Sequence, residues 1–232
     1  MIRRIEVVWP DDRPFTGRNG RPVRFLAVSD DPDPALEHAV NREALGPIDG
    51  VIGCGDLEPA WLGFLGDAFD VPLVYVRGNH DHGGAWTHGA VMIPAALHSG
   101  HIVRLAGIAI GGLEWPGVEM AGNRRRDGLA WRQTLGLWRR TVLGRLARRR
   151  EPILVISHAP PEGAGDASDD AYHVGFGAYR WLLERLRPLV WLHGHTTTAL
   201  VHQLSIQAGS TTVINVTGAV LLDLCPPPAE AG

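Results

Sequence analysis

Hydrophobic residues in the first half of the chain alternate between short apolar runs and helix-like spacing. The apolar runs cover residues 23–28, 51–54 and 72–76, and helical patterns cover 34–45 and 61–65. Short, continuous apolar runs bounded by turn residues are typical of strands that are buried on both faces. Alternation of strand and helix predicts βαβ units on a parallel sheet.

The second half of the chain adds an antiparallel feature. Residues 101–105 and 108–113 are strand-like and flank Ala106-Gly107, which predicts a β-hairpin. The other expected elements are helices over 128–149 and 176–186, buried strands over 153–156 and 189–192, and strand-and-turn segments over 199–224. The pattern as a whole predicts an α/β protein.

The length and composition favour a globular protein that forms one domain over residues 1–232. The chain has 232 residues, of which 45% are hydrophobic and 20% are charged, so it can bury a substantial core. Residues 1–22 are expected to form a short edge strand or a hairpin extension. Residues 225–232 contain three consecutive prolines and are expected to form a flexible tail.

Charge and cysteine content exclude several other classes of protein. The net charge of -3 gives no general attraction to nucleic acid or to anionic membranes. Cys54 and Cys225 lie far apart, so they indicate neither a zinc knuckle nor a disulfide framework. No apolar run is long enough to span a membrane, and the N-terminus does not resemble a signal peptide. A cytoplasmic protein without a membrane partner is therefore expected.

Arginines are concentrated between residues 124 and 150, in and around the predicted long helix. A solvated cationic helix face is the plain interpretation of this stretch. Nucleic acid remains an alternative partner, but it is not favoured because base-stacking aromatic residues do not recur at regular spacing. The sequence does not indicate an oligomeric state.

Polar residues of metal-ligand type follow five of the apolar runs. They are Asp30, Asp56, the segment Gly78-Asn79-His80-Asp81, His158, and the segment His193-Gly194-His195. Ligands in α/β sheets gather outside the carboxyl ends of the strands. An unpaired carboxylate is costly to bury, and a metal ion offsets that cost. The five strand ends together therefore predict a metal site, although each residue alone has an ordinary structural explanation.

In this order, the motifs resemble those of the calcineurin-like metallophosphoesterases. The corresponding segments are Ser29-Asp30-Asp31-Pro32, Gly55-Asp56, Gly78-Asn79-His80-Asp81, Ser157-His158-Ala159-Pro160 and Gly194-His195-Thr196-Thr197. The resemblance runs from about residue 24 to residue 223. It implies a four-layer αββα sandwich in which helices flank two mixed β-sheets. It also implies two metal ions, usually Mn, Fe or Zn, bridged by the second Asp. The Asp-Pro after Asp30 is similar to a bacterial branch of that family.

Transferred position by position, the resemblance leaves one metal site whole and the other incomplete. Asp56, Asn79, His158 and His195 match one complete set of ligands. The other site keeps Asp30 and a share of Asp56, because Pro32 and Thr197 stand where the family has histidine. One tight site and a second site that is weak or absent are expected. Mn²⁺ is the favoured metal, with Fe and Zn as alternatives. Asp31, Asp33 and His82 could each supply a missing ligand.

The expected activity is hydrolysis of a phosphomonoester or phosphodiester by a metal-activated water. The resemblance makes His80 the general acid, which Asp81 or Glu58 could orient. Asn79 could also donate to the phosphate, and His173 could reach the substrate from its loop. The substrate is expected to be a small-molecule or nucleotide phosphate ester. The alternative is a binding module that keeps this scaffold for a protein or nucleotide partner and has lost efficient catalysis.

Overall fold

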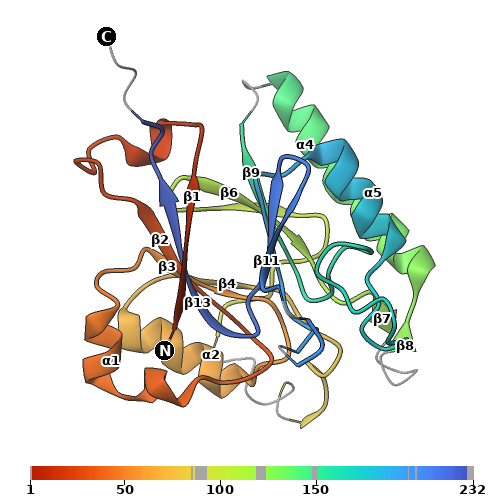
Figure 1. The fold of residues 1–232 in the computed structure, drawn as a ribbon, viewed down its shortest axis with the longest axis horizontal. Helices are drawn as coiled ribbons and strands as arrows, with labels where there is room; N and C mark the ends of the chain where they lie inside the picture. Colours follow the sequence, from red (N-terminus) through yellow and green to blue (C-terminus); the bar gives the residue numbers. More distant parts are fainter. Residues whose placement is uncertain are drawn as a thin grey trace.

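Two mixed β-sheets lie face to face at the centre of the molecule (Figure 1). The computed structural model describes residues 2–84, 86, 93–118, 124–147, 151–197, 199–201 and 203–228. The first sheet has the strand order β1-β13-β2-β3-β4. Its strands are β1 (Arg3–Val8), β2 (Val23–Ser29), β3 (Gly50–Gly53), β4 (Leu73–Tyr75) and β13 (Gly218–Cys225). β13 is antiparallel to β2, whereas the other pairs in this sheet are parallel.

The second sheet has the strand order β11-β12-β10-β9-β6-β5. Its strands are β5 (Ile102–Leu105), β6 (Ile108–Leu113), β9 (Ile153–Ser157), β10 (Val190–His193), β11 (Ser205–Ala208) and β12 (Thr211–Asn215). The expected hairpin is present as the antiparallel pair β5–β6. A short ribbon of β7 (Gly117–Val118) and β8 (Arg124–Arg125), which the hydrophobic pattern does not predict, follows β6.

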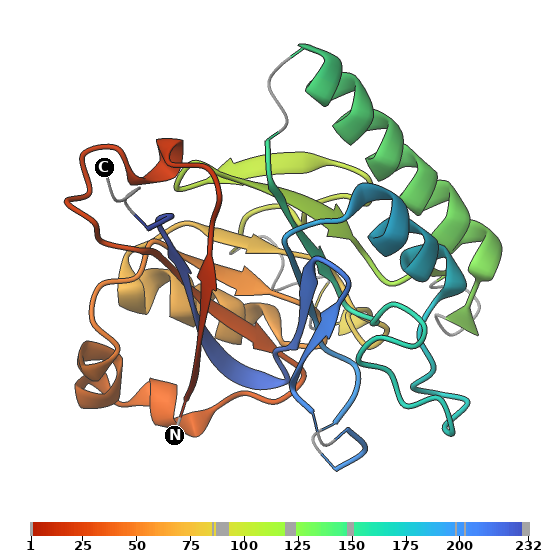
Figure 2. The ribbon, with the colours of Figure 1, turned by 45° about the horizontal axis from the view of Figure 1, so that its top comes forward.

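Helices cover the outer faces of both sheets, which completes the four-layer αββα arrangement expected from the resemblance. On the side of the first sheet lie the 3-10 turn η2 (Pro34–Glu37) and the helices α1 (Ala39–Ala44) and α2 (Pro59–Phe69). On the side of the second sheet lie α4 (Asp127–Ala147) and α5 (Gly177–Leu186), as Figure 2 shows from another angle. A further 3-10 turn, η1 (Arg13–Phe15), follows β1.

Alternate residues of each central strand enter different layers of the core. Phe25 and Ala27 of β2 face the second sheet, whereas Leu26 and Val28 face the helices on the other side. The second sheet behaves in the same way, with Leu154 turned inward and Val155 turned toward α4 and α5. Because both faces of these strands are buried, they read as continuous apolar runs in the sequence. The ends of these strands position the candidate site.

Two sequence expectations about the first half of the chain need correction. The helical pattern over 34–45 is not one helix, because His38 is extended (φ −91°, ψ 123°) and separates η2 from α1. Of the two alternatives for the N-terminal segment, the hairpin extension is wrong and the edge strand is confirmed. Residues 3–8 pair parallel with β13, more than 200 residues later in the sequence, and so form the edge strand of the first sheet.

The C-terminal end of the chain leaves the first sheet after Cys225. Residues 226–228 form no strand or helix, and residues 229–232, which complete the expected tail, lie outside the described part of the chain. None of the helices that the structure describes is both long enough and apolar enough to cross a lipid bilayer.

Candidate metal centre

The ends of strands from both sheets meet at one place between the two sheets. The turns after β2 and β3 carry Asp30 and Asp56, and the turn after β9 carries His158. One oxygen of each carboxylate and one ring nitrogen of His158 lie within 4.8 Å of one another. Among the described residues, this is the one group of three or more His, Cys, Asp or Glu side chains with such spacing.

The backbone at the site adopts conformations that most residues avoid. Asp30, Asp56 and His195 all have positive φ values, of 60°, 56° and 67°. The left-handed region is uncommon for residues other than glycine, although Asp, Asn and His are enriched there. Such positions persist where the surrounding contacts enforce them, and they cluster at functional sites. Each of the three follows a strand directly or within three residues, so these conformations lie in the turns that leave the strand ends.

Two motif glycines are needed because other groups occupy the space that a side chain would fill. A Cβ atom on Gly78 would collide with the carboxylate of Asp56, and one on Gly194 would collide with Ser29 and the carboxylate of Asp30. The strand ends can approach this closely only because these positions lack a side chain. The glycines of the motifs therefore set the spacing of the site and are not merely turn residues.

His158 lies at the centre of the site and is fully buried. Its Nδ1 lies 2.8 Å from the carbonyl oxygen of Cys54, and its Nε2 lies 2.8 Å from Oδ1 of Asn79 and 3.1 Å from Oδ2 of Asp56. The Cys54 carbonyl therefore orients the ring, and Nε2 is turned toward two oxygens of metal-ligand type. This arrangement brings together three of the four ligands expected for the complete site.

The charge of this cluster favours a cation. Burial lowers the pKa of His158, but the adjacent Asp56 carboxylate outweighs burial and raises that pKa to about 9. Burial raises the pKa of Asp56, but the charge of His158 and the hydrogen bonds from His158 and the His80 amide bring it below its usual value. Nε2 of His158 therefore faces a carboxylate oxygen of Asp56 and the amide oxygen of Asn79. A divalent cation fits this donor set of one imidazole, one amide and carboxylate oxygens.

His195, the fourth expected ligand, lies beside this cluster. Its ring centroid is 4.9 Å from the ring centroid of His158, and its Nε2 lies 2.8 Å from the carbonyl oxygen of Tyr172. Burial lowers the pKa of His195 to about 3, and the charge of His158 acts in the same direction, so this ring is neutral. If Nε2 donates its hydrogen to Tyr172, Nδ1 is the nitrogen with a lone pair for a metal.

The two carboxylates expected for the incomplete site, those of Asp30 and Asp56, lie beside His158, which the sequence assigns to the complete site. The Asp30 carboxylate accepts a hydrogen bond from the amide of His195, with N–O distances of 3.2 and 3.0 Å, and the Thr217 hydroxyl lies 3.3 Å from its Oδ2. Pro32 and Thr197 are both exposed. Asp30 therefore joins the two sheets across the site as well as offering an oxygen to it.

The alternative ligands for the incomplete site lie outside the cluster around His158. Asp33 accepts a hydrogen bond from the amide of Ala35, 2.9 Å away, and so caps η2. Asp31 and His82 are exposed. None of the three belongs to the group of metal-ligand atoms around His158.

The two expected catalytic residues differ in their surroundings. His80 is exposed, and its backbone amide donates to Oδ1 of Asp56 at 2.8 Å. This hydrogen bond holds the backbone of the Gly78-Asn79-His80-Asp81 segment next to the candidate ligands. Asp81 is buried, and its Oδ2 accepts hydrogen bonds from the amides of Asp56 (2.8 Å) and Gly78 (2.7 Å). Burial raises the pKa of Asp81, and the Gly78 amide opposes that rise. This geometry favours a positioning role for Asp81.

His173 lies next to the cluster on the loop that follows β9. Its ring centroid is 5.1 Å from that of His195, and its Nδ1 lies 2.7 Å from a carboxylate oxygen of Asp170. Arg125 of β8 holds this loop by donating to the carbonyls of Val174 (2.7 Å) and Gly175 (2.9 Å). The loop therefore places both His173 and the Tyr172 carbonyl at the edge of the site.

Trp115 is a site residue that the sequence reasoning missed. Its ring centroid lies 6.0 Å from that of His158 and 4.9 Å from that of His195. It follows β6, which is parallel to β9, so β6 contributes a sixth strand end at the same edge. The apolar run at 108–113 could have located Trp115, because it ends like the five runs that lead to candidate ligands. It was passed over because Glu114 and Trp115, which follow this run, do not match a metal-ligand motif.

A sequence model of the calcineurin-like phosphoesterases matches residues 45–198, which is well over half of the chain. The chain belongs to this family. The phosphoesterase thus falls within a class of metal-dependent hydrolases of phosphate esters, in agreement with the cluster around His158. No curated protein matches its sequence significantly.

Solved structures share the fold of this phosphoesterase at low sequence identity. The protein TT1561 of Thermus thermophilus superposes with a TM-score of 0.59 at 16% identity, covering 85% of this chain and 90% of that chain. A dimetal phosphatase from Danio rerio superposes with a TM-score of 0.52 at 13% identity, covering 85% and 88% of the two chains. These similarities support the four-layer architecture.

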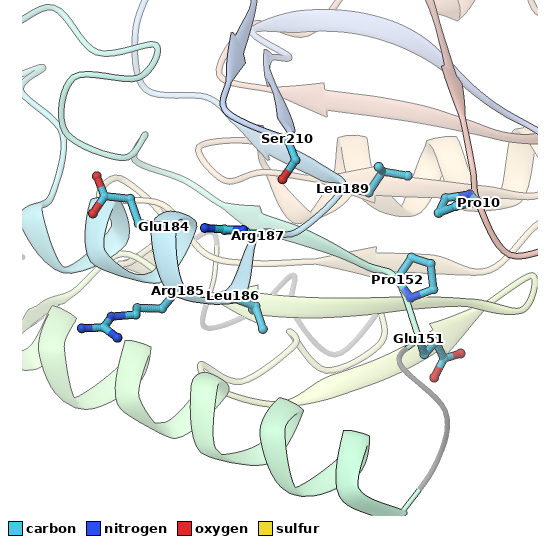
Figure 3. Close-up of a pocket in the computed structure, with 9 residues that line it drawn as sticks. All are labelled: Pro10, Glu151, Pro152, Glu184, Arg185, Leu186, Arg187, Leu189 and Ser210. Carbon is cyan, nitrogen blue, oxygen red and sulfur yellow. The ribbon is translucent and has the colours of Figure 1, made fainter.

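A cleft of about 560 Å³ lies away from this centre (Figure 3). Its lining residues are Pro10, Glu151, Pro152, Glu184, Arg185, Leu186, Arg187, Leu189 and Ser210. Pro152 precedes β9 and Leu189 precedes β10, whereas the candidate ligands His158 and His195 follow these strands. The cleft is therefore at the opposite end of the second sheet from the candidate metal centre.

Proposed function

We propose that this phosphoesterase hydrolyses a phosphate ester of a small molecule or nucleotide, either a monoester or a diester, using one firmly bound divalent cation. The observation that carries the proposal is the convergence of Asp56, Asn79 and His158, with His158 Nε2 3.1 Å and 2.8 Å from the two oxygens. We assign the chain to the branch of the family with Asp-Pro in the first motif, on the basis of Asp31-Pro32.

Asp56, Asn79, His158 and His195 would hold the cation. Mn²⁺ is the favoured ion for this mixed oxygen and nitrogen donor set, with Fe and Zn as alternatives. When bound, a divalent cation neutralises charge on the phosphoryl oxygens and lowers the pKa of a coordinated water. Asp30 and Asp56 would hold a cation at the incomplete site, which would therefore bind it weakly or only together with substrate.

The remaining steps belong to side chains around this cluster. His80 is exposed next to Asp56 and gives a proton to the oxygen of the leaving group. Asp81 supports that step indirectly, because it holds the amides of Asp56 and Gly78 in place. Asn79 can donate from its amide nitrogen to a phosphoryl oxygen. His173, oriented by Asp170, contacts the substrate from the loop after β9.

The experiment is a measurement of Mn²⁺-dependent turnover with bis(p-nitrophenyl) phosphate and with p-nitrophenyl phosphate. The Asp56→Asn variant keeps the size of the side chain but removes its charge, so most of the turnover should disappear. Asp67→Asn makes the same change on the exposed face of α2 and should leave turnover unchanged. Equal activity in the wild type and Asp56→Asn would contradict the proposal.

A non-catalytic binding module is the second candidate, favoured by Pro32 and Thr197, which are exposed and add no ligand to the incomplete site. In that case neither substrate would be turned over with any of Mn²⁺, Fe²⁺ or Zn²⁺. The protein would still bind Mn²⁺ and inorganic phosphate at the His158 cluster, which isothermal titration calorimetry would detect.

A further inference from the structure

β1 is an edge strand with one side left open. It pairs with β13 and stands at the end of the first sheet. Figures 1 and 2 both draw it in front of the other strands of that sheet, at the surface of the molecule. Among the described residues, no other strand pairs with its outer side. Such an edge presents backbone groups that can pair with another strand.

The backbone groups that point outward can be identified from the end of the strand. The amide of Trp9 donates to the carbonyl of Cys225, 2.8 Å away, at the end of β13. Backbone groups of successive residues in a strand point to alternate sides. The odd-numbered residues of β1 therefore face β13, and the even-numbered residues face outward. Those even-numbered residues, Arg4, Glu6 and Val8, also carry the exposed side chains of the strand.

We propose that β1 pairs antiparallel with β1 of a second copy of this chain, around a two-fold axis at Ile5. In this register Arg4 of each copy lies opposite Glu6 of the other copy, and Ile2 lies opposite Val8. Opposite charges and apolar pairs placed directly across an antiparallel pair stabilise it. The two five-stranded sheets would become one continuous sheet with a self-complementary interface, as a two-fold dimer requires.

Neighbouring registers are disfavoured by charge. An axis at Arg4 would place the two Arg4 side chains opposite each other, and an axis at Glu6 would place the two Glu6 side chains opposite each other. Like charges directly opposite each other destabilise a strand pair. Of these three registers, the one centred on Ile5 alone pairs unlike charges at both positions. It also uses every outward-facing residue from Ile2 to Val8.

The side chains at this edge are suited to that pairing. Arg4 is held in place because its Nε donates to Asp223 of β13 at 2.7 Å, so little of its side-chain freedom remains to be lost on association. Val8 is 55% exposed although it is apolar, and a second strand would cover it. At the axis the two Ile5 side chains would meet on the face that packs toward the second sheet.

Molar mass in solution tests the proposal. Light scattering after gel filtration of the wild type should show twice the monomer mass at high protein concentration and dissociation on dilution. Glu6→Arg would place Arg4 opposite an arginine, so it should give a monomer at all concentrations. Glu43→Arg makes the same charge change on the exposed surface of α1 and should remain dimeric. A monomeric wild type, or a dimer unaffected by Glu6→Arg, overturns the proposal.

Cysteine cross-linking tests the register, in a Cys225→Ser background because Cys225 lies opposite Val8 in the sheet. Ile5→Cys should form an inter-subunit disulfide on oxidation, since residues at the axis face each other at about 4.5 Å between Cα atoms. Val8→Cys is the control, because the two Val8 positions would be about 20 Å apart, six residues along the strands. Cross-linking of Val8→Cys but not Ile5→Cys would refute this register.

Discussion

In the candidate metal centre, each of the two histidine rings has one nitrogen held by a backbone carbonyl. The Cys54 carbonyl holds Nδ1 of His158, and the Tyr172 carbonyl holds Nε2 of His195. Such contacts select which ring nitrogen is left for a metal and keep the ring in position. At the proposed site, the affinity for metal should therefore depend on these backbone carbonyls as well as on the ligands themselves.

Replacing His158 by Ala should remove most of the bound metal, because His158 is one of only four protein ligands at the proposed site. Metal content would be measured by elemental analysis after dialysis. His38→Ala is the matched control, since His38 is an exposed histidine between η2 and α1. Unchanged metal content in His158→Ala would show that the assignment of this ligand is wrong.

Replacing His80 by Ala should leave metal content unchanged but slow turnover by roughly 10²–10⁴-fold, the usual contribution of general acid–base catalysis. The loss should be smaller for p-nitrophenyl esters than for alkyl esters, because a good leaving group needs less protonation. His82→Ala, two residues along the same exposed turn, should behave as the wild type. Full activity of His80→Ala on an alkyl ester would contradict the role of general acid.

At the scale of elements, the site is a junction between the ends of strands that belong to different sheets. The amide of His195, after β10, donates to Asp30, after β2, and the amide of Gly194 donates to the carbonyl of His158 at 2.9 Å. The turns approach closely enough for these contacts only where side chains are absent. Small changes at the strand ends should therefore change the whole cluster.

Gly194→Ala should destabilise the protein and weaken metal binding, because the added methyl group meets Ser29 and the Asp30 carboxylate. Gly144→Ala is the control, since nothing lies within 4 Å of a Cβ at that position in α4. In a helix, that substitution should stabilise the fold by about 0.5–1 kcal/mol. Urea unfolding of both variants measures the two effects, and equal stability would rule out the proposed close approach.

Arg125 joins β8 to the loop that carries His173. Its guanidinium donates to two carbonyls of that loop and lies 3.9 Å from the centre of the Phe176 ring. Arg125→Ala should therefore speed hydrogen exchange in residues 162–175 and raise KM more than it lowers kcat. Arg124→Ala, at the exposed position before it, should change neither quantity. Unaltered exchange in Arg125→Ala would show that this contact does not hold the loop.

For the whole molecule, the two sheets contribute different kinds of side chain to the candidate metal centre. The second sheet supplies His158 and His195, which both belong to one expected site, whereas the other site depends on Asp30 and Asp56 of the first sheet. His158 is the imidazole that lies within 4.8 Å of both carboxylates, and it is already assigned to the complete site, so the proposed incomplete site would have no histidine of its own. The number of metal ions bound per chain should therefore rise when substrate is present.

Titration of metal-free protein with Mn²⁺ should give one tight site per chain, and added phosphate should raise the occupancy of a second by bridging both positions. Calorimetry with and without phosphate measures this stoichiometry. The double variant Pro32→His with Thr197→His should gain affinity at the second position. Two tight sites in the wild type without phosphate would contradict the idea.

Local patterns were sufficient to predict much of the fold. Apolar runs located β2, β3, β9 and β10, because strands buried on both faces leave no polar positions within the run. The β5–β6 hairpin was also predicted, since its turn chemistry lies within two residues. The helix expected over 34–45 is interrupted at His38, where the backbone is extended. Hydrophobic spacing does not predict such a local change of backbone conformation.

The sequence by itself determined the order of strands and helices and the residue types at their ends, because periodicity, turn residues and motif glycines are local properties. Only the tertiary structure decided that β1 joins β13, that Cys54 orients His158 across 104 residues, and that Trp115 stands against both histidines. These contacts depend on how the two sheets pack together. Residues far apart in the chain meet only when the core between the sheets is formed, so no local pattern encodes them.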